Sequence, residues 1–442
     1  MTSLSIKNNK KISCFTNGYN NFILKRDIKL IVVYICLYLL FAVGIIPKDI
    51  IFGLITGFFI VASTKGTLIM YLFFVLWENV GVFSFGLTLS FLLQIILFIK
   101  IIINCIRYNK IVFYNLSDMF FLMLSFFYGF MNFLIGTGGL TGIRLAINVI
   151  IALYSFTLYQ DEEQSAGFWK AVFFTLMLST IIASIYGFFN DTANDRWIAG
   201  MGYIKQIYGT VGTARMGMYF CASLIYPVFY LREKMAKIIL CLMLSLGALM
   251  TFSITTLICL VMFWGFIILF KNKTNIAKKI IGIFIVFLCL FMLIIFWDRI
   301  SEIIIFKPIS IRIEKMVEAL QSGNINAATS SRSYLAEMYI NDFKEYSIIN
   351  KLFGSFFINR FSVITGYGWG VENYAHNSII DILLYMGIFG VAIFFIKLAM
   401  RASYLRKREE FLPVILLKLI FMLTGLSVSM LTNSYWFIFM VL

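Results

Sequence analysis

Long apolar segments separated by short polar turns run along most of the chain. A transmembrane α-helix needs roughly 20 consecutive apolar residues, and most of these segments approach that length. The segments predicted to cross a membrane are 28–46, 50–64, 67–83, 85–106, 117–136, 140–159, 168–189, 216–231, 236–252, 253–270, 280–297, 377–397, 411–431 and a short stretch at 434–442. Since 50–64 and 434–442 are short for a bilayer, and adjoining segments can be broken or re-entrant helices, we expect about 12 to 14 transmembrane helices.

Two longer polar stretches, 190–215 and 298–376, interrupt this pattern. Within the second, residues 310–320 and 332–346 repeat apolar positions every three to four residues, which predicts short amphipathic helices lying on the bundle or on the membrane surface. The predicted organisation is listed here in chain order: a basic cytoplasmic tail (1–27), transmembrane helices with an outer loop at 190–215 (28–297), a large extracytoplasmic loop (298–376) and C-terminal transmembrane helices (377–442).

Composition supports this interpretation, because 61% of the 442 residues are hydrophobic and only 13% are charged. Those values exclude a soluble globular enzyme and indicate an all-α polytopic integral membrane protein. The net charge of +16 would suggest nucleic-acid binding in a soluble chain. Here Lys and Arg concentrate in alternate short loops, as the positive-inside rule requires, so we expect no nucleic-acid partner.

The same rule predicts the orientation of the chain. It places the basic tail in the cytoplasm and the loops 190–215 and 298–376 outside it. The acidic residues Asp161, Glu162 and Glu163 fall in a loop counted as cytoplasmic, but acidic residues carry little weight in the rule. The seven cysteines show no paired or metal-ligand spacing, so neither disulfides nor a metal site is expected.

His376 is the single histidine of the chain and lies where the large loop enters the next predicted helix. A histidine can take and return protons near neutral pH, so it is a candidate general base, although a lone histidine there can also be an interfacial polar group or a helix cap. Its neighbours form the pattern His376-Asn377-X9-Gly387-X-X-Gly390. This pattern resembles the signature of the superfamily of O-antigen ligases and Wzy-type O-antigen and capsule polymerases.

Two further segments are similar to motifs of that superfamily. Ser331 and Arg332 look like its Ser/Gly-Arg motif, while the stretch 209–215, ending at Arg215, resembles an earlier outer-loop motif but lacks the Asn-Pro often found there. Arginine binds phosphate in a bidentate manner and stays charged, so the two arginines are candidates to hold a lipid diphosphate. Alternatively, either one pairs with loop carboxylates such as Glu337 or with lipid headgroups.

Several other residues are candidates on more general grounds. Arg144, Glu78 and Asp381 lie within predicted membrane segments, where a charge is costly and suggests function, although snorkelling or interhelical pairing explains them equally well. Aromatic residues of the large loop can stack on sugars or form an interfacial belt; they include Tyr339, Trp369 and Tyr374. Gly387 and Gly390 can simply serve close helix packing.

The resemblance implies a membrane glycosyltransferase fold and a specific reaction. The expected donor is an undecaprenyl diphosphate-linked oligosaccharide, His376 would deprotonate the acceptor hydroxyl, and Arg332, Arg215 and Arg144 would bind the diphosphate without metal or cofactor. The expected location is the cytoplasmic membrane, with the site on its extracytoplasmic face. Expected partners are membrane lipids, and a chain-length regulator and a flippase are further candidates.

Polymerisation of repeat units is the favoured reaction, and ligation of the glycan to lipid A core or protein is the alternative. A lipid-linked oligosaccharide flippase is an alternative of a different class. A flippase should show two similar halves and short loops, whereas this sequence has no evident repeat and one large loop.

Overall fold

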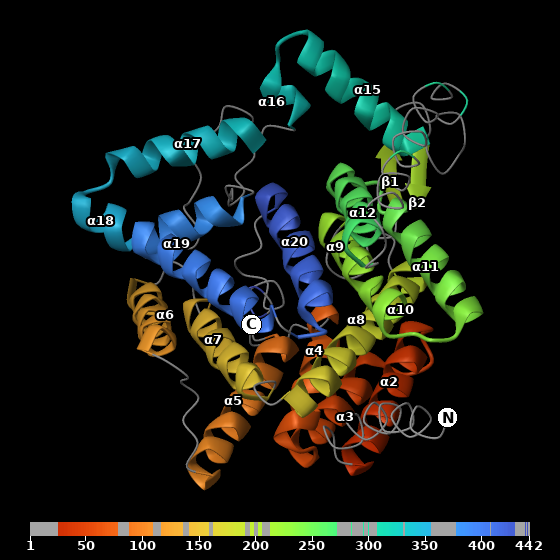
Figure 1. Ribbon diagram of the computed structural model, residues 1–442, viewed down its shortest axis with the longest axis vertical. Helices are drawn as coiled ribbons and strands as arrows, with labels where there is room; N and C mark the ends of the chain where they lie inside the picture. The colour runs from red at the N-terminus through yellow and green to blue at the C-terminus, as the bar shows by residue number, and fades with distance from the viewer. Residues whose placement is uncertain are drawn as a thin grey trace, which may run out of the picture.

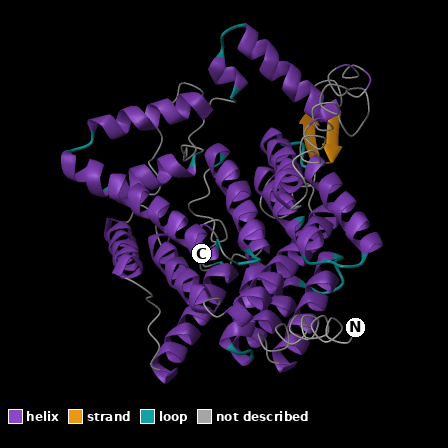
Figure 2. Ribbon diagram, viewed as in Figure 1, coloured by secondary structure: helices purple, strands orange, loops and turns teal. Residues whose placement is uncertain are grey.

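The computed structural model consists almost entirely of helices (Figures 1 and 2). It describes residues 25–77, 88–108, 116–135, 141–158, 162–190, 195–198, 202–205, 213–271, 307–329, 332–354, 377–406 and 408–428, together with the isolated positions 284, 295, 299, 438 and 440. The predicted segments 280–297 and 434–442 therefore lie almost wholly outside the described residues.

The first helices form one packed group. They are α2 (Lys25–Ala42), α3 (Lys48–Val61), α4 (Thr64–Phe74) with a 3-10 turn η1 (Val75–Trp77), and α5 (Leu89–Tyr108). Helix α2 packs against both α3 and α4, and buried aromatic rings such as Tyr34, Tyr38 and Trp77 fill the space between them. Helix α2 begins at Lys25, three residues before the predicted segment 28–46, and the side chain of Asp27 is buried.

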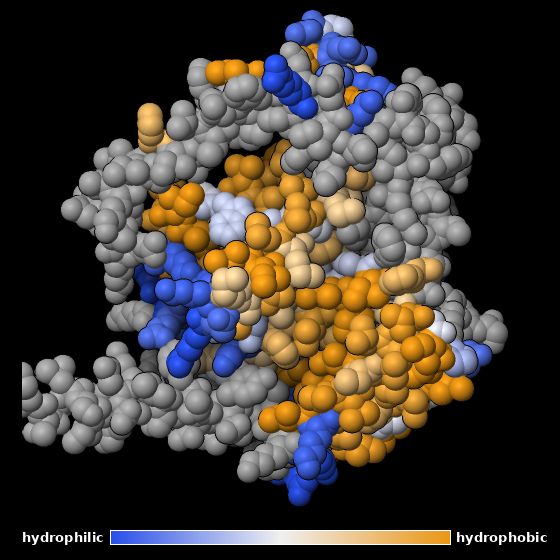
Figure 3. All heavy atoms as spheres, turned by 90° about the vertical axis from the view of Figure 1, so that its right-hand side faces the viewer, coloured by the Kyte–Doolittle hydropathy of each residue, from blue (hydrophilic) through white to orange (hydrophobic). Residues whose placement is uncertain are grey.

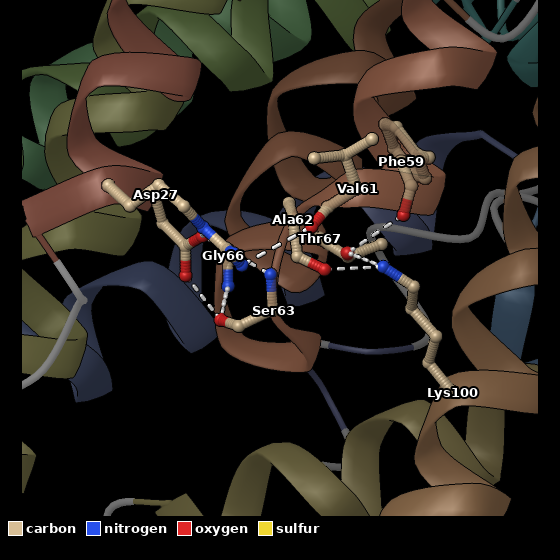
Figure 4. A network of polar contacts seen from close by, with 9 residues as sticks. Asp27, Phe59, Val61, Ala62, Ser63, Gly66, Thr67 and Lys100 are labelled. Atoms are coloured by element: carbon tan, nitrogen blue, oxygen red, sulfur yellow. Dashed lines mark hydrogen bonds and ion pairs between the residues drawn. The ribbon is translucent and has the colours of Figure 1, made fainter.

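A network of polar contacts closes the break between α3 and α4 (Figure 4). Asp27 accepts hydrogen bonds from the backbone nitrogen of Ser63, at 3.2 Å, and from its hydroxyl. Lys100, on α5, donates to the carbonyl oxygen of Ala62 at 2.5 Å and to Thr67 Oγ1 at 3.0 Å. A carboxylate near the start of a helix and a cation near the end of one are both favourable, so the network stabilises the two helix ends left exposed by the break.

The middle of the chain contributes three longer helices and a hairpin. The helices are α6 (Leu116–Ile135), α7 (Thr141–Leu158) and α8 (Glu162–Asn190), and α8 packs against α2 and α4. The strands β1 (Asp195–Ile198) and β2 (Gly202–Lys205) form an antiparallel pair that the all-helical prediction did not include.

The next helices pack against α8 and against one another. They are α9 (Thr213–Ser223), α10 (Ile225–Phe229), α11 (Lys234–Leu249) and α12 (Ile254–Phe266), which continues as the π-helical turn η3 (Ile267–Lys271). The segment predicted as one helix, 216–231, is therefore interrupted at Leu224, two residues before Tyr226-Pro227. Proline removes a backbone donor, which explains why a regular helix does not continue through this position.

The large loop contains helices at the places where the sequence predicted them. Helices α15 (Lys307–Gln321) and α17 (Arg332–Glu345) correspond to the expected amphipathic helices, and α16 (Ile325–Ala328) and α18 (Ile348–Phe353) lie between and after them. The last two helices are α19 (Ser378–Leu405) and α20 (Phe411–Ser427). In Figure 1, α15 to α18 lie together along one side of the molecule.

Four described helices are long and apolar enough to cross a membrane: Leu89–Arg107, Ser165–Gly187, Ile254–Lys271 and Ser378–Leu405. Hydrophobic side chains also cover much of the described surface in Figure 3. Helix α11, for example, has the exposed residues Ile239, Leu242 and Met243. The described helices thus have the lengths and apolar surfaces of a helical membrane protein. The total of about 12 to 14 crossings stays a prediction.

Candidate functional site

The sequence pattern from Asn377 to Gly387 corresponds to one short structural unit. The side-chain oxygen of Asn377 accepts hydrogen bonds from the backbone nitrogens of Ile379, at 3.0 Å, and Ile380, at 3.3 Å, and so caps the start of α19. The helix bends at Gly387, where φ is 70° and ψ is −169°. The nine residues of the motif therefore form a helical segment about 13 Å long between its cap and the bend.

Helix α17 packs directly against this segment. Tyr339 of α17 and Tyr346, directly after this helix, form a buried cluster with Ile380 and Leu384 of α19. Only 3% of the surface of Tyr339 is exposed, so a sugar can reach its ring only if α17 leaves α19. Tyr339 is accordingly a packing residue in this structure, which argues against its predicted role in sugar stacking.

Arg332 opens α17 and is half-buried. Among the residues that the structure describes, its guanidinium has no hydrogen-bond or ion-pair partner, in contrast to the predicted alternative of pairing with Glu337. Burial lowers the pKa of Arg332 from its usual value, because desolvation disfavours the charged form. A partly desolvated cation without a partner is suited to bind an anion.

Arg215 lies in the first turn of α9, and a series of contacts connects this helix to the start of α19. Gly217 approaches Thr256 so closely that a Cβ on the glycine would overlap the threonine side chain. The neighbouring Thr255 donates to Ser427 Oγ at 2.9 Å, and Ser378 Oγ donates to the carbonyl oxygen of Val428 at 3.1 Å. The start of α9 and the Asn377 cap are thus at the same end of the helix bundle.

The turn between α11 and α12 also lies at this end. Phe252 has a φ of 49°, in the left-handed region, which costs a non-glycine residue roughly 1–2 kcal/mol. The buried hydroxyl of Thr251 donates to Ala248 O at 2.8 Å and to Thr256 Oγ1 at 3.2 Å, which holds the turn in place. The sequence predicted a break between helices here, at 252–253, but not the left-handed Phe252, since no glycine marks that position.

Arg144 is held by polar residues of α5. Its Nε donates to Gln94 Oε1 at 3.2 Å and its Nη2 to Ser90 Oγ at 2.5 Å, while Gln94 also contacts Asn148. The described hydrogen bonds of Arg144 therefore fix its guanidinium on α5. The polar residues Ser90 and Gln94 within an apolar helix were the available signal for this contact.

The sequence missed a buried ion-pair cluster of Asp118, Lys397 and Arg401. Asp118 of α6 accepts from Lys397 and, at 3.2 Å, from Arg401, whose guanidinium also stacks 3.2 Å from the ring centroid of Phe156. The segments predicted at 377–397 and 411–431 leave Arg401 in the connection between them, but α19 continues to Leu405 and buries it. Two features of the sequence could have indicated this cluster. Lys397 and Arg401 have i, i+4 spacing, and Asp118 is an acid within another apolar segment.

Other predicted site residues lie outside the described residues: His376, Ser331, Trp369, Tyr374 and Glu78. Gly390 is described, and the three atoms nearest to a Cβ on it belong to the side chain of Met386, one turn earlier. Asp381 is buried one turn after Asn377, on the same segment of α19. Within the described parts of the chain, no group of three or more His, Cys, Asp or Glu residues could hold a metal ion.

The arrangement therefore places one desolvated arginine, one capped helix start and the start of α9 at one end of a helix bundle. No protein-family model matches the chain, and no curated protein matches it.

Proposed function

We propose that the chain is a membrane-embedded glycosyltransferase that polymerises oligosaccharide repeat units carried on undecaprenyl diphosphate. The observation that carries the proposal is Arg332, a half-buried guanidinium without a described partner, on a helix that packs against the segment capped by Asn377. The spacing from His376 to Gly390, which resembles that of the polymerase and ligase superfamily, adds the reaction type.

In this proposal His376 removes the proton from the acceptor hydroxyl. The hydroxyl oxygen then forms a bond to the anomeric carbon of the donor, while the bond from that carbon to the diphosphate oxygen breaks and the lipid diphosphate leaves with the electron pair. Displacement from the opposite side inverts the anomeric configuration. Arg332, with Arg215 and Arg144 as further candidates, stabilises the negative charge on the leaving diphosphate.

The proposed location is the cytoplasmic membrane, with the reacting groups on its extracytoplasmic face. No ATP is present there, so the donor must carry its own activation, as a diphosphate-linked sugar does. A flippase that delivers the donor and a chain-length regulator are the proposed partners.

The test compares a strain lacking this gene with the same strain complemented by the wild-type protein or by His376→Ala. We expect the deletion to remove long surface glycans while single repeat units still reach the surface. Complementation with His376→Ala, at equal expression, should not restore the long glycans. The measurements are the length profile of the surface glycan on gels and the profile of the lipid-linked intermediates.

Three other outcomes would overturn parts of the proposal. Wild-type chain lengths with His376→Ala would remove the histidine from the reaction. Long lipid-linked chains that never reach an acceptor would indicate the ligase, and repeat units retained on the cytoplasmic face would indicate the flippase.

A further inference from the structure

Two glycines from different helices adopt backbone conformations that other residues rarely reach. Gly354 ends α18 with φ 85° and ψ 174°, and Gly387 forms the bend of α19 with φ 70° and ψ −169°. Both lie in a region of φ and ψ that is essentially restricted to glycine. Only Gly387 belongs to the sequence motif, and nothing in the motif indicates Gly354.

The two glycines contact each other's helices through the backbone. A Cβ on Gly354 would overlap the carbonyl oxygen of Tyr385, and a Cβ on Gly387 would overlap the carbonyl oxygen of Leu352 and lie 2.5 Å from the nitrogen of Gly354. These neighbours are backbone atoms, which cannot rotate aside as the end of a side chain can. Each helix therefore requires the glycine of the other.

Side chains on both sides of this contact hold the same two helices together. The rings of Phe353 and Phe389 lie 5.3 Å apart, one residue before Gly354 and two residues after Gly387. On the other side, Tyr339 and Tyr346 pack against Ile380 and Leu384. Helices α17 and α18 are thus attached along the whole segment between Asn377 and the bend.

We infer that Gly354 is a positioning residue, which together with Gly387 forms a backbone latch between α18 and α19. The latch fixes the register of α17 and α18 on the capped segment of α19, and with it the place of Arg332. The role of Arg332 rests on the proposed function, whereas the latch is a physical contact that can be measured independently of any activity.

The contact is measured by disulfide formation between Phe353→Cys and Phe389→Cys in a protein whose seven native cysteines are replaced. We expect this pair to cross-link in membranes under mild oxidation. Gly354→Ala or Gly387→Ala should lower the yield at least tenfold, and in the otherwise wild-type protein each should shorten the surface glycan.

Gly323→Ala is the matched control, because Gly323 also has a positive φ, of 71°, but has no atom within 4 Å of its Cβ position. It should leave cross-linking and glycan length unchanged. Gly265→Ala, in the open surface of α12, controls for replacing a membrane-helix glycine. The variants are compared at equal amounts of protein in the membrane. Each must also elute as a single symmetric size-exclusion peak after detergent extraction, which excludes misfolding as the cause.

The outcomes separate the latch from the proposed function. Cross-linking of Gly354→Ala at the wild-type yield would overturn the latch. Loss of cross-linking in Gly354→Ala, combined with repeat units retained on the cytoplasmic face when the gene is deleted, would keep the latch and overturn the glycosyltransferase. Loss of cross-linking in Gly323→Ala as well would assign the effect to backbone strain and would also overturn the latch.

Discussion

Arg332 is unusual among the described charged residues because burial has removed part of its water shell without supplying a partner. Hydrogen bonds to a charged group contribute roughly 1.5–3 kcal/mol, so an anion that meets this guanidinium gains a substantial interaction. Arg144, by contrast, already donates to Gln94 and Ser90 and is held in place without a ligand. Of these two, Arg332 is therefore the better candidate to bind an anionic substrate.

Replacing Arg332 should impair the proposed reaction more than replacing another cation of the same helix. Arg332→Ala is expected to reduce long-chain glycan by about 10- to 100-fold, which corresponds to the loss of charge-assisted hydrogen bonds. Arg332→Lys should reduce long-chain glycan less than Arg332→Ala does, since lysine keeps the charge but lacks the bidentate fork. Lys344→Ala, on the exposed face of α17, should change little. Equal glycan profiles for Arg332→Ala and Lys344→Ala would contradict the assignment.

At the level of residues, the sequence predicted those features that follow from the spacing of the motif. The sequence predicted a helix beginning at 377 and offered close helix packing as the role of Gly387 and Gly390. The structure has a cap at Asn377, and it adds a bend at Gly387 that was not predicted. It could not predict Gly354, because the contact arises between segments far apart in the chain. Nor could it distinguish a buried Tyr339 from an exposed one, since aromatic residues suit both environments.

At the level of helices, the interaction between α6 and α19 depends on charge as well as apolar packing. Lys397, Arg401 and Asp118 are almost completely buried. Removing one member of such a cluster leaves an uncompensated buried charge, whereas replacing all of them by apolar residues of similar volume is often neutral or stabilising. The cluster therefore specifies how α19 sits against α6 more than it adds to the free energy of unfolding.

Asp118→Ala should consequently be among the more destabilising substitutions in the chain, at about 3–5 kcal/mol, the cost of breaking a buried pair. The triple variant Asp118→Leu, Lys397→Met and Arg401→Met should recover more than half of that loss. The measurement is the midpoint of thermal aggregation in detergent, with the exposed Asp49→Ala as control. A triple variant less stable than Asp118→Ala would show that the charges themselves stabilise the fold.

Apolar periodicity predicted most helices within a few residues, but their ends and interruptions depend on tertiary contacts. Helix α19 extends eight residues beyond the predicted end, because Asp118 compensates the charge of Arg401, which had suggested a loop. The β1–β2 hairpin was also not predicted, since its two strands of four residues are too short to show alternation.

On the scale of the whole molecule, the described contacts agree with a chain that alternates direction. Asp118, at the start of α6, contacts Lys397 and Arg401 in the last third of α19. Thr255 and Cys259 of α12 contact Ser427 and Thr424 of α20, respectively, so α12 and α20 are antiparallel. If α19 crosses a membrane, α15 to α18 lie on one side of the membrane and the basic residues after α19 lie on the other.

Single cysteines in a protein without native cysteines test this arrangement. Ser322→Cys, in the exposed turn after α15, should react with a membrane-impermeant maleimide in intact spheroplasts. Arg406→Cys, at the end of α19, should react only after the membrane is permeabilised. The reverse pattern would invert the orientation, and labelling of both positions from one side would contradict an odd number of crossings between them.

The contacts around Asp27 have a consequence for how the protein is made. Every partner in that network, from Arg26 to Lys100, belongs to the first 108 residues of the chain. Helices α2 to α5 can therefore satisfy the polar groups at the α3–α4 break without help from any later part of the chain. This group can form its polar contacts before the later helices have packed against it.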